Sequence, residues 1–263
     1  VIDSRVSSQF VSSVLLTAPY AREDVTITLP SPPASASYID LTLDIMRWFG
    51  AVVRTERPQR FTVQAGRHYL PQDYTVEGDY SSASYFFAIA AICGGCVRVG
   101  NLNPRSVQGD RRFVGALESM GCKVQESGRM ISVERKGPLT GIDIDMTTSP
   151  DTVQTLCAVA AVASSPSRIY GISHLQYKES DRVKATGVLL KQMGADIRVE
   201  DDTIFISPAP LHGITIDPGD DHRTAMSGAV IGLATGGMKI LNAECVDKSF
   251  PGFWKALGEA GLV

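Results

Sequence analysis

One pattern of hydrophobic segments recurs along the whole chain. An apolar, helix-like run comes first, a short strand-like segment and a second helix closed by glycine follow, and two further strands complete the unit. Gly121 and Gly194 close the second helix in two successive copies, and glycine pairs follow the first helix at 94–95 and 236–237. Such repetition constrains the fold strongly, because the chain must be built from equivalent structural units.

Four copies of the unit can be located. The first helices are predicted at 8–17, 82–92, 151–162 and from 222 onward, and the second helices at 39–49, 111–120, 181–193 and 250–261. Strands are predicted at 25–29, 61–63, 97–99, around 124, 131–133, 168–172, around 197, 204–206 and 239–241. A strand before the first helix, at 74–76, 142–144 and 214–216, makes the complete unit βαβαββ and the fold class α/β.

The first helix of each copy is apolar nearly all round. A helix of that kind belongs in a protein interior, whereas a helix with a single apolar stripe lies at the surface. Three copies can therefore bury their first helices together beneath strands and amphipathic helices. The predicted domain boundary is at Pro71-Gln72-Asp73, with one repeat in residues 1–76 and three repeats in residues 77–263.

Composition excludes several classes of protein. Of the 263 residues, 44% are hydrophobic and 20% are charged, which is typical of a globular protein and not of a disordered one. The net charge of −3 gives no electrostatic basis for binding nucleic acid or an anionic membrane, and no apolar run is long enough to span a bilayer. Five cysteines scattered through apolar segments indicate a reducing compartment, so we predict a cytoplasmic location.

Two of these cysteines have the spacing of a redox or zinc motif, in Cys93-Gly94-Gly95-Cys96. No second pair of cysteines or histidines completes a metal site around them. The motif also straddles the turn that ends an apolar helix. We therefore predict that both cysteines are small core residues and that the chain binds no metal.

Charged and hydroxyl side chains gather at the predicted helix starts. These segments are 7–9, Asp151, 178–182, 220–223 and 248–251. A helix N-terminus attracts anions through its free N–H groups and its dipole, so cations there are unfavourable unless an anion joins them. Each segment taken singly is also explained by an ordinary cap or a solvated turn. Their equivalent positions in the repeats favour an anion-binding site.

Several motifs occur in the chain in a characteristic order. They are Ser7-Ser8-Gln9-Phe10, Tyr38-Ile39-Asp40, Glu77-Gly78-Asp79 with Ser81-Ser82-Ala83, Gln108-Gly109-Asp110, Lys178-Glu179-Ser180-Asp181-Arg182, Asp221-His222-Arg223 and Lys248-Ser249-Phe250-Pro251. Together they resemble the 5-enolpyruvylshikimate-3-phosphate synthase family of enolpyruvyl transferases, over the whole chain. The resemblance implies an inside-out α/β fold, barrel-like domains of three βαβαββ repeats with buried helices, and an active site in the cleft between two such domains.

The resemblance also implies the reaction. The family transfers the enolpyruvyl group of phosphoenolpyruvate to the 5-hydroxyl of shikimate 3-phosphate, in the shikimate pathway of aromatic amino acid biosynthesis, without cofactor or metal. The hydroxyl adds to C2 while C3 is protonated, and the adduct then loses phosphate as C3 gives up a proton. By resemblance, Asp151 is the base for the hydroxyl, and Glu179 and Lys178 are the candidates for proton exchange at C3. The choice between these two stays open.

Binding residues follow from the same resemblance. For phosphoenolpyruvate they are Gln9, Arg182, Arg223 and Lys248, and a guanidinium suits this anion because it donates two parallel hydrogen bonds. For shikimate 3-phosphate they are Ser7, Ser8, Gln9, Ser35, Tyr38, Asp151, His174 and Lys178. The chain departs from the family at His174, where many members have Asn, and at Thr224, where Met is usual; we expect the second change to alter only packing. The family's inhibitor glyphosate occupies the phosphoenolpyruvate site.

The resemblance implies six repeats, and four are present. We therefore expect an incomplete enzyme, inactive alone, whose partner is a complementing segment with the missing N-terminal repeats or a second copy of the chain. Two other functions stay open: a UDP-N-acetylglucosamine enolpyruvyl transferase, with another acceptor, and a catalytically silent scaffold of the same fold. Segments 7–9 and 178–182 favour shikimate 3-phosphate over the first, and the intact charged residues argue against the second.

Overall fold

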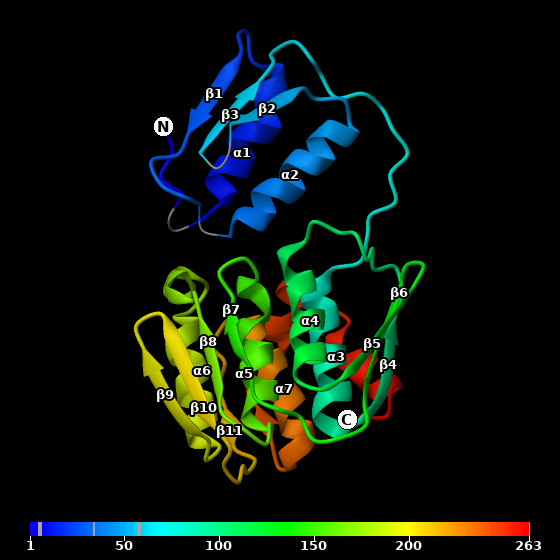
Figure 1. The fold of residues 1–263 in the computed structure, drawn as a ribbon, viewed down its shortest axis with the longest axis vertical. Helices are drawn as coiled ribbons and strands as arrows, with labels where there is room; N and C mark the ends of the chain where they lie inside the picture. Colours follow the sequence, from blue (N-terminus) through cyan, green and yellow to red (C-terminus); the bar gives the residue numbers. More distant parts are fainter. Residues whose placement is uncertain (5–6, 34, 57–58, 263) are drawn as a thin grey trace. The chain divides into compact units, whose positions relative to one another are not determined.

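The computed structural model describes residues 1–4, 7–33, 35–56 and 59–262 (Figure 1). The chain divides into two compact units. The first comprises Val1–Glu77 and Arg105–Gly109, and the second comprises Gly78–Pro104 and the chain from Asp110 onward. This division differs from the expected boundary in assigning Glu77 and the segment Arg105–Gly109 to the first unit.

The first unit is one repeat, in which two helices cover a three-stranded sheet. The helices are α1 (Gln9–Thr17), the short 3₁₀ helix η1 (Ala18–Tyr20) and α2 (Ala36–Trp48). The strands are β1 (Val25–Thr28), β2 (Val53–Glu56) and β3 (Arg60–Val63), which form an antiparallel sheet in the order β1-β3-β2. Strand β2 was not among the predicted elements. Val11, Leu15 and Leu43 are fully buried where the helices pack on the sheet.

The second unit contains the other three repeats in sequence. Its α-helices are α3 (Tyr80–Cys93), α4 (Arg112–Ser119), α5 (Val153–Ala161), α6 (Arg182–Gln192), α7 (His222–Thr235) and α8 (Phe253–Glu259). Its strands are β4 (Gly95–Val99), β5 (Lys123–Ser127), β6 (Met130–Arg135), β7 (Asp143–Asp145), β8 (Ser167–Tyr170), β9 (Asp196–Glu200), β10 (Thr203–Ser207), β11 (Thr215–Ile216) and β12 (Lys239–Ile240). Short 3₁₀ helices are η2 (Gly109–Arg111), η3 (Pro150–Thr152), η4 (Ser173–Tyr177) and η5 (Ala243–Lys248).

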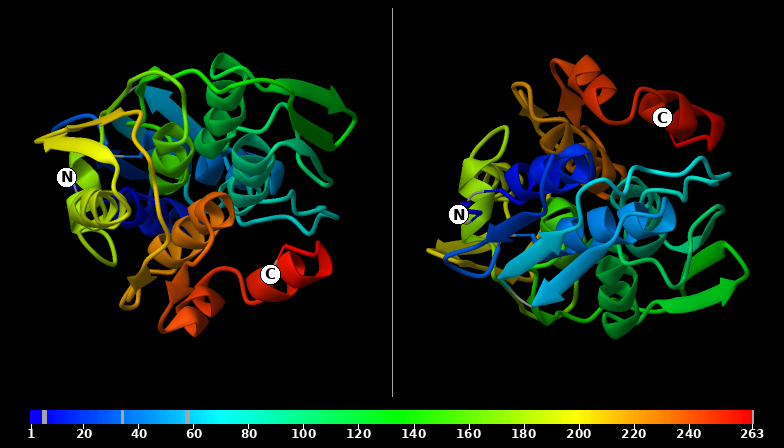
Figure 2. Two further views of the ribbon diagram at one scale, coloured as in Figure 1. Left: turned by 90° about the horizontal axis from the view of Figure 1, so that it is seen from below. Right: turned by 90° about the horizontal axis from the view of Figure 1, so that it is seen from above.

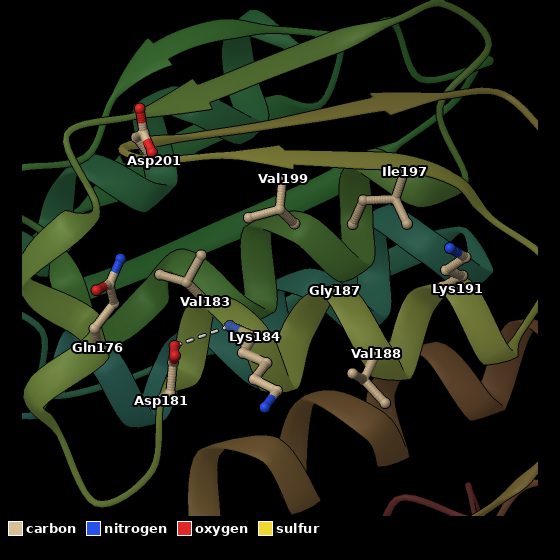
Figure 3. A pocket seen from close by; sticks show the side chains of 10 residues that line it. All are labelled: Gln176, Asp181, Val183, Lys184, Gly187, Val188, Lys191, Ile197, Val199 and Asp201. Atoms are coloured by element: carbon tan, nitrogen blue, oxygen red, sulfur yellow. Dashed lines mark hydrogen bonds between the residues drawn. The ribbon is translucent and has the colours of Figure 1, made fainter.

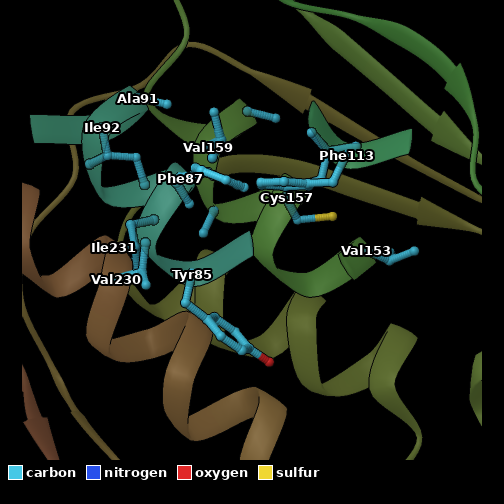
Figure 4. Packing of buried hydrophobic residues seen from close by; sticks show 14 of the residues in the cluster. Tyr85, Phe87, Ala91, Ile92, Phe113, Val153, Cys157, Val159, Val230 and Ile231 are labelled. Atoms are coloured by element: carbon cyan, nitrogen blue, oxygen red, sulfur yellow. The ribbon is translucent and has the colours of Figure 1, made fainter. Parts of the chain in front are cut away.

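Helices α3, α5 and α7 lie side by side at the centre of this unit (Figure 2, left). Every residue of α5 is buried, which confirms that these apolar helices are interior. Their side chains form one hydrophobic cluster that includes Tyr85, Phe87 and Ile231 (Figure 4). Burial of each large apolar side chain contributes about 1.5–3 kcal/mol, so this cluster dominates the stability of the unit.

The strands form three small sheets around the helices. Their orders are β4-β6-β5, β7-β8-β10-β9 and β11-β12. Helix α3 contacts β4 and β6, α5 contacts β8 and β10, and α7 contacts β12. The enolpyruvyl-transferase arrangement expected from the sequence, with helices inside and strands outside, is therefore present in this unit.

Asp79 and Asp221 begin two of the buried helices in the same way. The carboxylate of Asp79 accepts hydrogen bonds from the backbone N–H groups of Ser81 and Ser82. Asp221 likewise accepts from the N–H of Arg223 at the start of α7. An acidic cap satisfies free N–H groups and favours the positive end of the helix dipole.

Two expectations from the sequence were wrong. Residues 74–76 form no strand, because the Tyr74 ring packs on Trp48 and Phe49, with centroid separations of 5.6 and 5.9 Å. Cys93 and Cys96 are exposed and not core residues, since the turn between them lies at the surface.

The described residues hold neither a metal-binding cluster nor a membrane-spanning helix. No group of three or more His, Cys, Asp or Glu side chains is placed to hold a metal ion. No helix in the described parts of the chain is long and apolar enough to cross a membrane.

Candidate active site

The first turns of the three buried helices meet at one end of the second unit, and Arg223 joins them. This residue is the second of α7. Its Nη1 atom donates to the Asp151 carbonyl oxygen at 3.0 Å and lies 3.4 Å from the Tyr85 hydroxyl of α3. Its Nη2 atom lies 3.4 Å from the Ser81 Oγ atom. The positive ends of three helix dipoles therefore surround one group of charged side chains.

Arg182, the first residue of α6, is the most buried cation of this group. Its side chain is 2% exposed, and each guanidinium nitrogen has its own carboxylate. Nε lies 3.1 Å from Oδ2 of Asp221, Nη1 lies 3.2 Å from Oδ1 of Asp151, and Nη2 lies 2.7 Å from Oε2 of Glu179. A buried charge is costly unless it is paired and hydrogen-bonded, so these contacts are required for Arg182 to occupy this position.

Asp151 links the two arginines. It lies in η3, directly before α5. Its Oδ1 atom contacts Arg182, and its Oδ2 atom accepts a hydrogen bond of 2.7 Å from Nη2 of Arg223. Its side chain is 19% exposed, so it stays accessible from outside.

Glu179 is paired with Arg182 on one oxygen and with Lys248 on the other. The Lys248 Nζ atom lies 2.8 Å from Oε1, and its side chain is half exposed at the end of η5. Burial alone would raise the pKa of Glu179. The hydrogen bond from Lys248 and the charge of Arg182 outweigh it and lower that pKa to about 2.

The two histidines near these charges are buried and favour the neutral form. Burial, followed by the charge of Lys178, lowers the pKa of His174. Burial, then the charges of Arg223 and Arg182, lowers the pKa of His222. The Nε2 atom of His174 and the Nδ1 atom of His222 have no hydrogen-bond partner among the described residues. Lys178 follows η4 and makes no ion pair with the described parts of the chain.

The other predicted residues lie in the first unit, where two helices begin. Ser7, Ser8 and Gln9 are at the start of α1, and Ser35 and Tyr38 are at the start of α2. Ser8 and Ser35 are each 3% exposed. Ser35 has a φ of 54°, a left-handed conformation that is uncommon for a residue with a side chain.

Contacts within each unit join the elements that carry the predicted residues. In the first unit, the Ser12 and Thr42 hydroxyl oxygens lie 2.8 Å apart and join α1 to α2. In the second, Asp151, Glu179, Arg182, Arg223 and Lys248 form one continuous ion-pair network.

Three further residues that contact this network were not predicted as site residues. Asp221 accepts from Arg182 and, at 2.6 Å, from the Ser180 hydroxyl, and its carboxylate is inaccessible. Ser81 and Tyr85 contact Arg223. Asp221 and Ser81 belong to motifs that carried the resemblance. Tyr85 gave no signal, because it lies within an apolar helix.

A groove of about 440 Å³ lies along α6 and β9 (Figure 3). Val183, Val188 and Val199 line it together with Lys184 and Lys191. It includes none of the predicted site residues, so the ion-pair network is the better candidate for chemistry.

This fold and this network define an enolpyruvyl-transferase-type protein. The family described as EPSP synthase (3-phosphoshikimate 1-carboxyvinyltransferase) matches residues 1–257, and the chain belongs to that family.

Relatives and solved structures agree with this assignment. The chain is 61% identical over its whole length to a 3-phosphoshikimate 1-carboxyvinyltransferase of Methanoculleus marisnigri and 56% identical over 98% of its length to one of Methanoregula boonei. It covers 62% and 61% of these two relatives. It also resembles an EPSP synthase structure from Acinetobacter baumannii, with a TM-score of 0.82 and 29% identity over the whole chain and 62% of that structure. The chain therefore spans about three fifths of the length of its relatives.

Proposed function

We propose that this chain supplies the catalytic carboxylates and part of the phosphoenolpyruvate-binding cations of an enzyme that transfers enolpyruvyl to the 5-hydroxyl of shikimate 3-phosphate. The observation that supports it most is the network of Asp151, Glu179, Arg182, Arg223 and Lys248, gathered at three helix N-termini in a chain of this family. Cations, carboxylates and helix dipoles in one place suit a reaction of two anions that needs a base and an acid.

Asp151 is the proposed base that takes the hydroxyl proton. Both of its oxygens are held by guanidinium groups, which fix the orientation of the carboxylate. A base held in position before the substrate arrives contributes more than a mobile one, because little reorganisation is needed.

Arg182, Arg223 and Lys248 are the proposed ligands of phosphoenolpyruvate, with Gln9. The positive and negative charges of the network are equal in number. The cations are Arg182, Arg223 and Lys248, and the carboxylates are Asp151, Glu179 and Asp221. An arriving phosphate and carboxylate therefore compete with Glu179 for Lys248, which is the exposed member. The exposed position of Lys248 makes it the first cation that the substrate meets.

That competition gives Glu179 a proposed role in proton exchange at C3. Burial raises the pKa of Glu179, but the hydrogen bond from Lys248 and the charge of Arg182 lower it to about 2. When phosphoenolpyruvate takes these cations, the pKa of Glu179 rises, and the carboxyl group can accept and return a proton. Lys178 is the other candidate for this proton exchange.

Shikimate 3-phosphate is proposed to bind to Ser7, Ser8, Gln9, Ser35 and Tyr38, at the starts of α1 and α2, together with Asp151, His174 and Lys178. Hydroxyls and free N–H groups at helix starts suit a phosphate. Buried, neutral His174 can donate only one hydrogen bond at a time to the substrate.

We further propose a cytoplasmic enzyme that needs a complementing segment. Phe10 and Leu16 of α1 are 58% and 43% exposed, whereas the equivalent helix α5 is buried throughout. This apolar surface fits the buried helices of two further repeats, which the resemblance implies. Self-association through α1 is the alternative.

The decisive assay measures phosphate release from phosphoenolpyruvate. The chain is tested alone and together with the part of the Methanoculleus marisnigri relative that it does not cover, expressed separately or fused. We expect turnover with shikimate 3-phosphate only in the complemented protein, and none with UDP-N-acetylglucosamine. Turnover with the second acceptor would replace the proposed substrate, and a folded complemented protein inactive with both would favour the silent scaffold.

A further inference from the structure

Gln154 and Thr224 form a hydrogen bond in the apolar interior between α5 and α7. The Gln154 Nε2 atom lies 2.9 Å from Thr224 Oγ1, and the two residues are 4% and 7% exposed. One residue further along α5, the Thr155 and Ser227 hydroxyl oxygens are 3.4 Å apart. These four residues form a polar seam, a row of polar side chains within the contact between two otherwise apolar helices. Thr224 therefore does more than alter packing.

The position of the hydrogen bond ties it to the ion-pair network. Gln154 lies three residues after Asp151, and Thr224 directly follows Arg223. Asp151 lies in η3, directly before α5, and Arg223 lies in α7, so their 2.7 Å contact depends on how α5 and α7 are registered against each other. Apolar contacts have little directionality, whereas a hydrogen bond is sensitive to distance and angle.

Stability alone does not account for this pair. The Gln154 Oε1 atom is buried without a hydrogen-bond partner among the described residues. A buried acceptor without a partner is destabilising, and apolar side chains of similar shape would avoid that cost. Polar pairs in apolar interiors can instead fix one register at the expense of stability.

We infer that Gln154 and Thr224 are positioning residues, which set the register of α5 against α7 and thereby hold Arg223 on the Asp151 carboxylate. The catalytic part of this inference rests on the proposed function. The geometric part concerns the free chain and stands independently.

Two variants remove the hydrogen bond with little change of shape, Thr224→Val and Gln154→Leu. Thr224→Ser keeps the hydroxyl and is the conservative variant. Thr155→Val is the matched control, since it removes the neighbouring hydroxyl of the same seam without touching the Gln154–Thr224 pair.

The first readout is hydrogen exchange of the Arg223 guanidinium by NMR in the 263-residue chain. We expect Thr224→Val and Gln154→Leu to speed this exchange roughly tenfold, with the double variant no faster than either alone, because residues that act as one unit are not additive. Thr224→Ser and Thr155→Val should match the wild type. Wild-type exchange in Thr224→Val and Gln154→Leu, or equal acceleration in Thr155→Val, would overturn the inference.

The second readout is the rate of the complemented protein. A loosened ion pair should lower kcat by roughly tenfold in Thr224→Val, with a smaller change in KM, because misplacement of a catalytic group acts mainly on turnover. Thr224→Ser should restore the rate. A wild-type complemented protein without turnover would refute the proposed function, while the exchange measurement would still decide the geometric inference. An active complemented protein in which Thr224→Val keeps wild-type kcat would refute the catalytic part.

Discussion

Asp151 accepts one guanidinium on each carboxylate oxygen, and this makes its role as a base testable by a single substitution. Asp151→Asn keeps the shape of the side chain but removes the proton acceptor. We expect kcat of the complemented protein to fall by about 10²-fold or more, while phosphoenolpyruvate still binds, as for a removed general base. Steady-state kinetics with phosphoenolpyruvate varied would measure both effects.

Asp143→Asn is the control for that change. Asp143 is also an aspartate paired with an arginine, Arg168, but both side chains are exposed and outside the network. It should keep wild-type kinetics. Near-normal turnover in Asp151→Asn would show that another group takes the hydroxyl proton.

Glu179 makes stability depend on pH in a defined direction. Its pKa is lowered from 4.5 to about 2 in the folded protein, by Lys248 and Arg182 acting against burial. A carboxyl group with a depressed pKa stabilises the folded state above its ordinary pKa, and that contribution is lost as the pH falls through the lowered value. The wild type should therefore be more stable than Glu179→Gln at neutral pH, and the difference should shrink between pH 4.5 and about 2.

The measurement is denaturant unfolding of both proteins across this pH range. Glu259→Gln is a suitable control, because the Glu259 side chain is 69% exposed and paired only with Lys255 in the described chain. A difference between wild type and Glu179→Gln that stays constant on acidification would contradict the lowered pKa.

At the scale of helices and strands, the sequence predicted those elements whose pattern is local. The apolar helices α3, α5 and α7 were found because their composition requires burial, and acidic caps mark the starts of α3 and α7. Strand β2 was missed, since Val53-Arg54-Thr55-Glu56 is a short edge strand with no fully buried residue.

Contacts between distant residues could not be predicted in the same way. The strand expected at 74–76 was wrong because Tyr74 packs on Trp48, far away in the sequence. Within the site, the helix starts were predictable, but the contact of Arg182 with Asp221, 39 residues apart, was not. Tertiary packing overrides local propensity at such positions.

A glycine before two of the strands illustrates how the repeats fit together. Gly141 precedes β7 and Gly213 precedes β11, and a Cβ atom at either position would overlap backbone atoms: Ser165 and Pro166 for the first, Gly236 and Gly237 for the second. In both repeats the chain thus passes close over the turn that follows the buried helix.

We expect Gly141→Ala to destabilise the protein by about 1–3 kcal/mol, because the backbone it meets must shift. Gly115 lies on the exposed face of α4, and a Cβ atom added there would have no described atom within 4 Å. Gly115→Ala should therefore stabilise the protein by up to about 1 kcal/mol, because alanine has the higher helix propensity. Thermal unfolding of the two variants beside the wild type would measure both effects. Equal stability of Gly141→Ala and wild type would show that the close approach is absent in solution.

On the scale of the whole molecule, the two units differ in how completely they bury equivalent helices. The second unit encloses α3, α5 and α7 within one cluster, whereas α1 in the first unit leaves Phe10 58% and Leu16 43% exposed. Large apolar side chains left exposed on one helix favour association. The chain is therefore expected to self-associate through α1 when no complementing segment is present.

Replacing Phe10 and Leu16 by serine tests whether the chain self-associates through α1. If the two side chains are buried on association, each contributes about 1.5–3 kcal/mol, so the variant carrying Phe10→Ser and Leu16→Ser should weaken the association constant at least tenfold. Sedimentation velocity over a range of concentrations would measure it. The control carries Val188→Ser and Val199→Ser, which remove apolar side chains of comparable exposure, 48% and 41%, from the second unit. The complementing segment should make the wild type as monomeric as the α1 variant, since both would remove the same exposed surface. A chain that is monomeric by itself, or that associates equally well without Phe10 and Leu16, would show that α1 is not the surface involved.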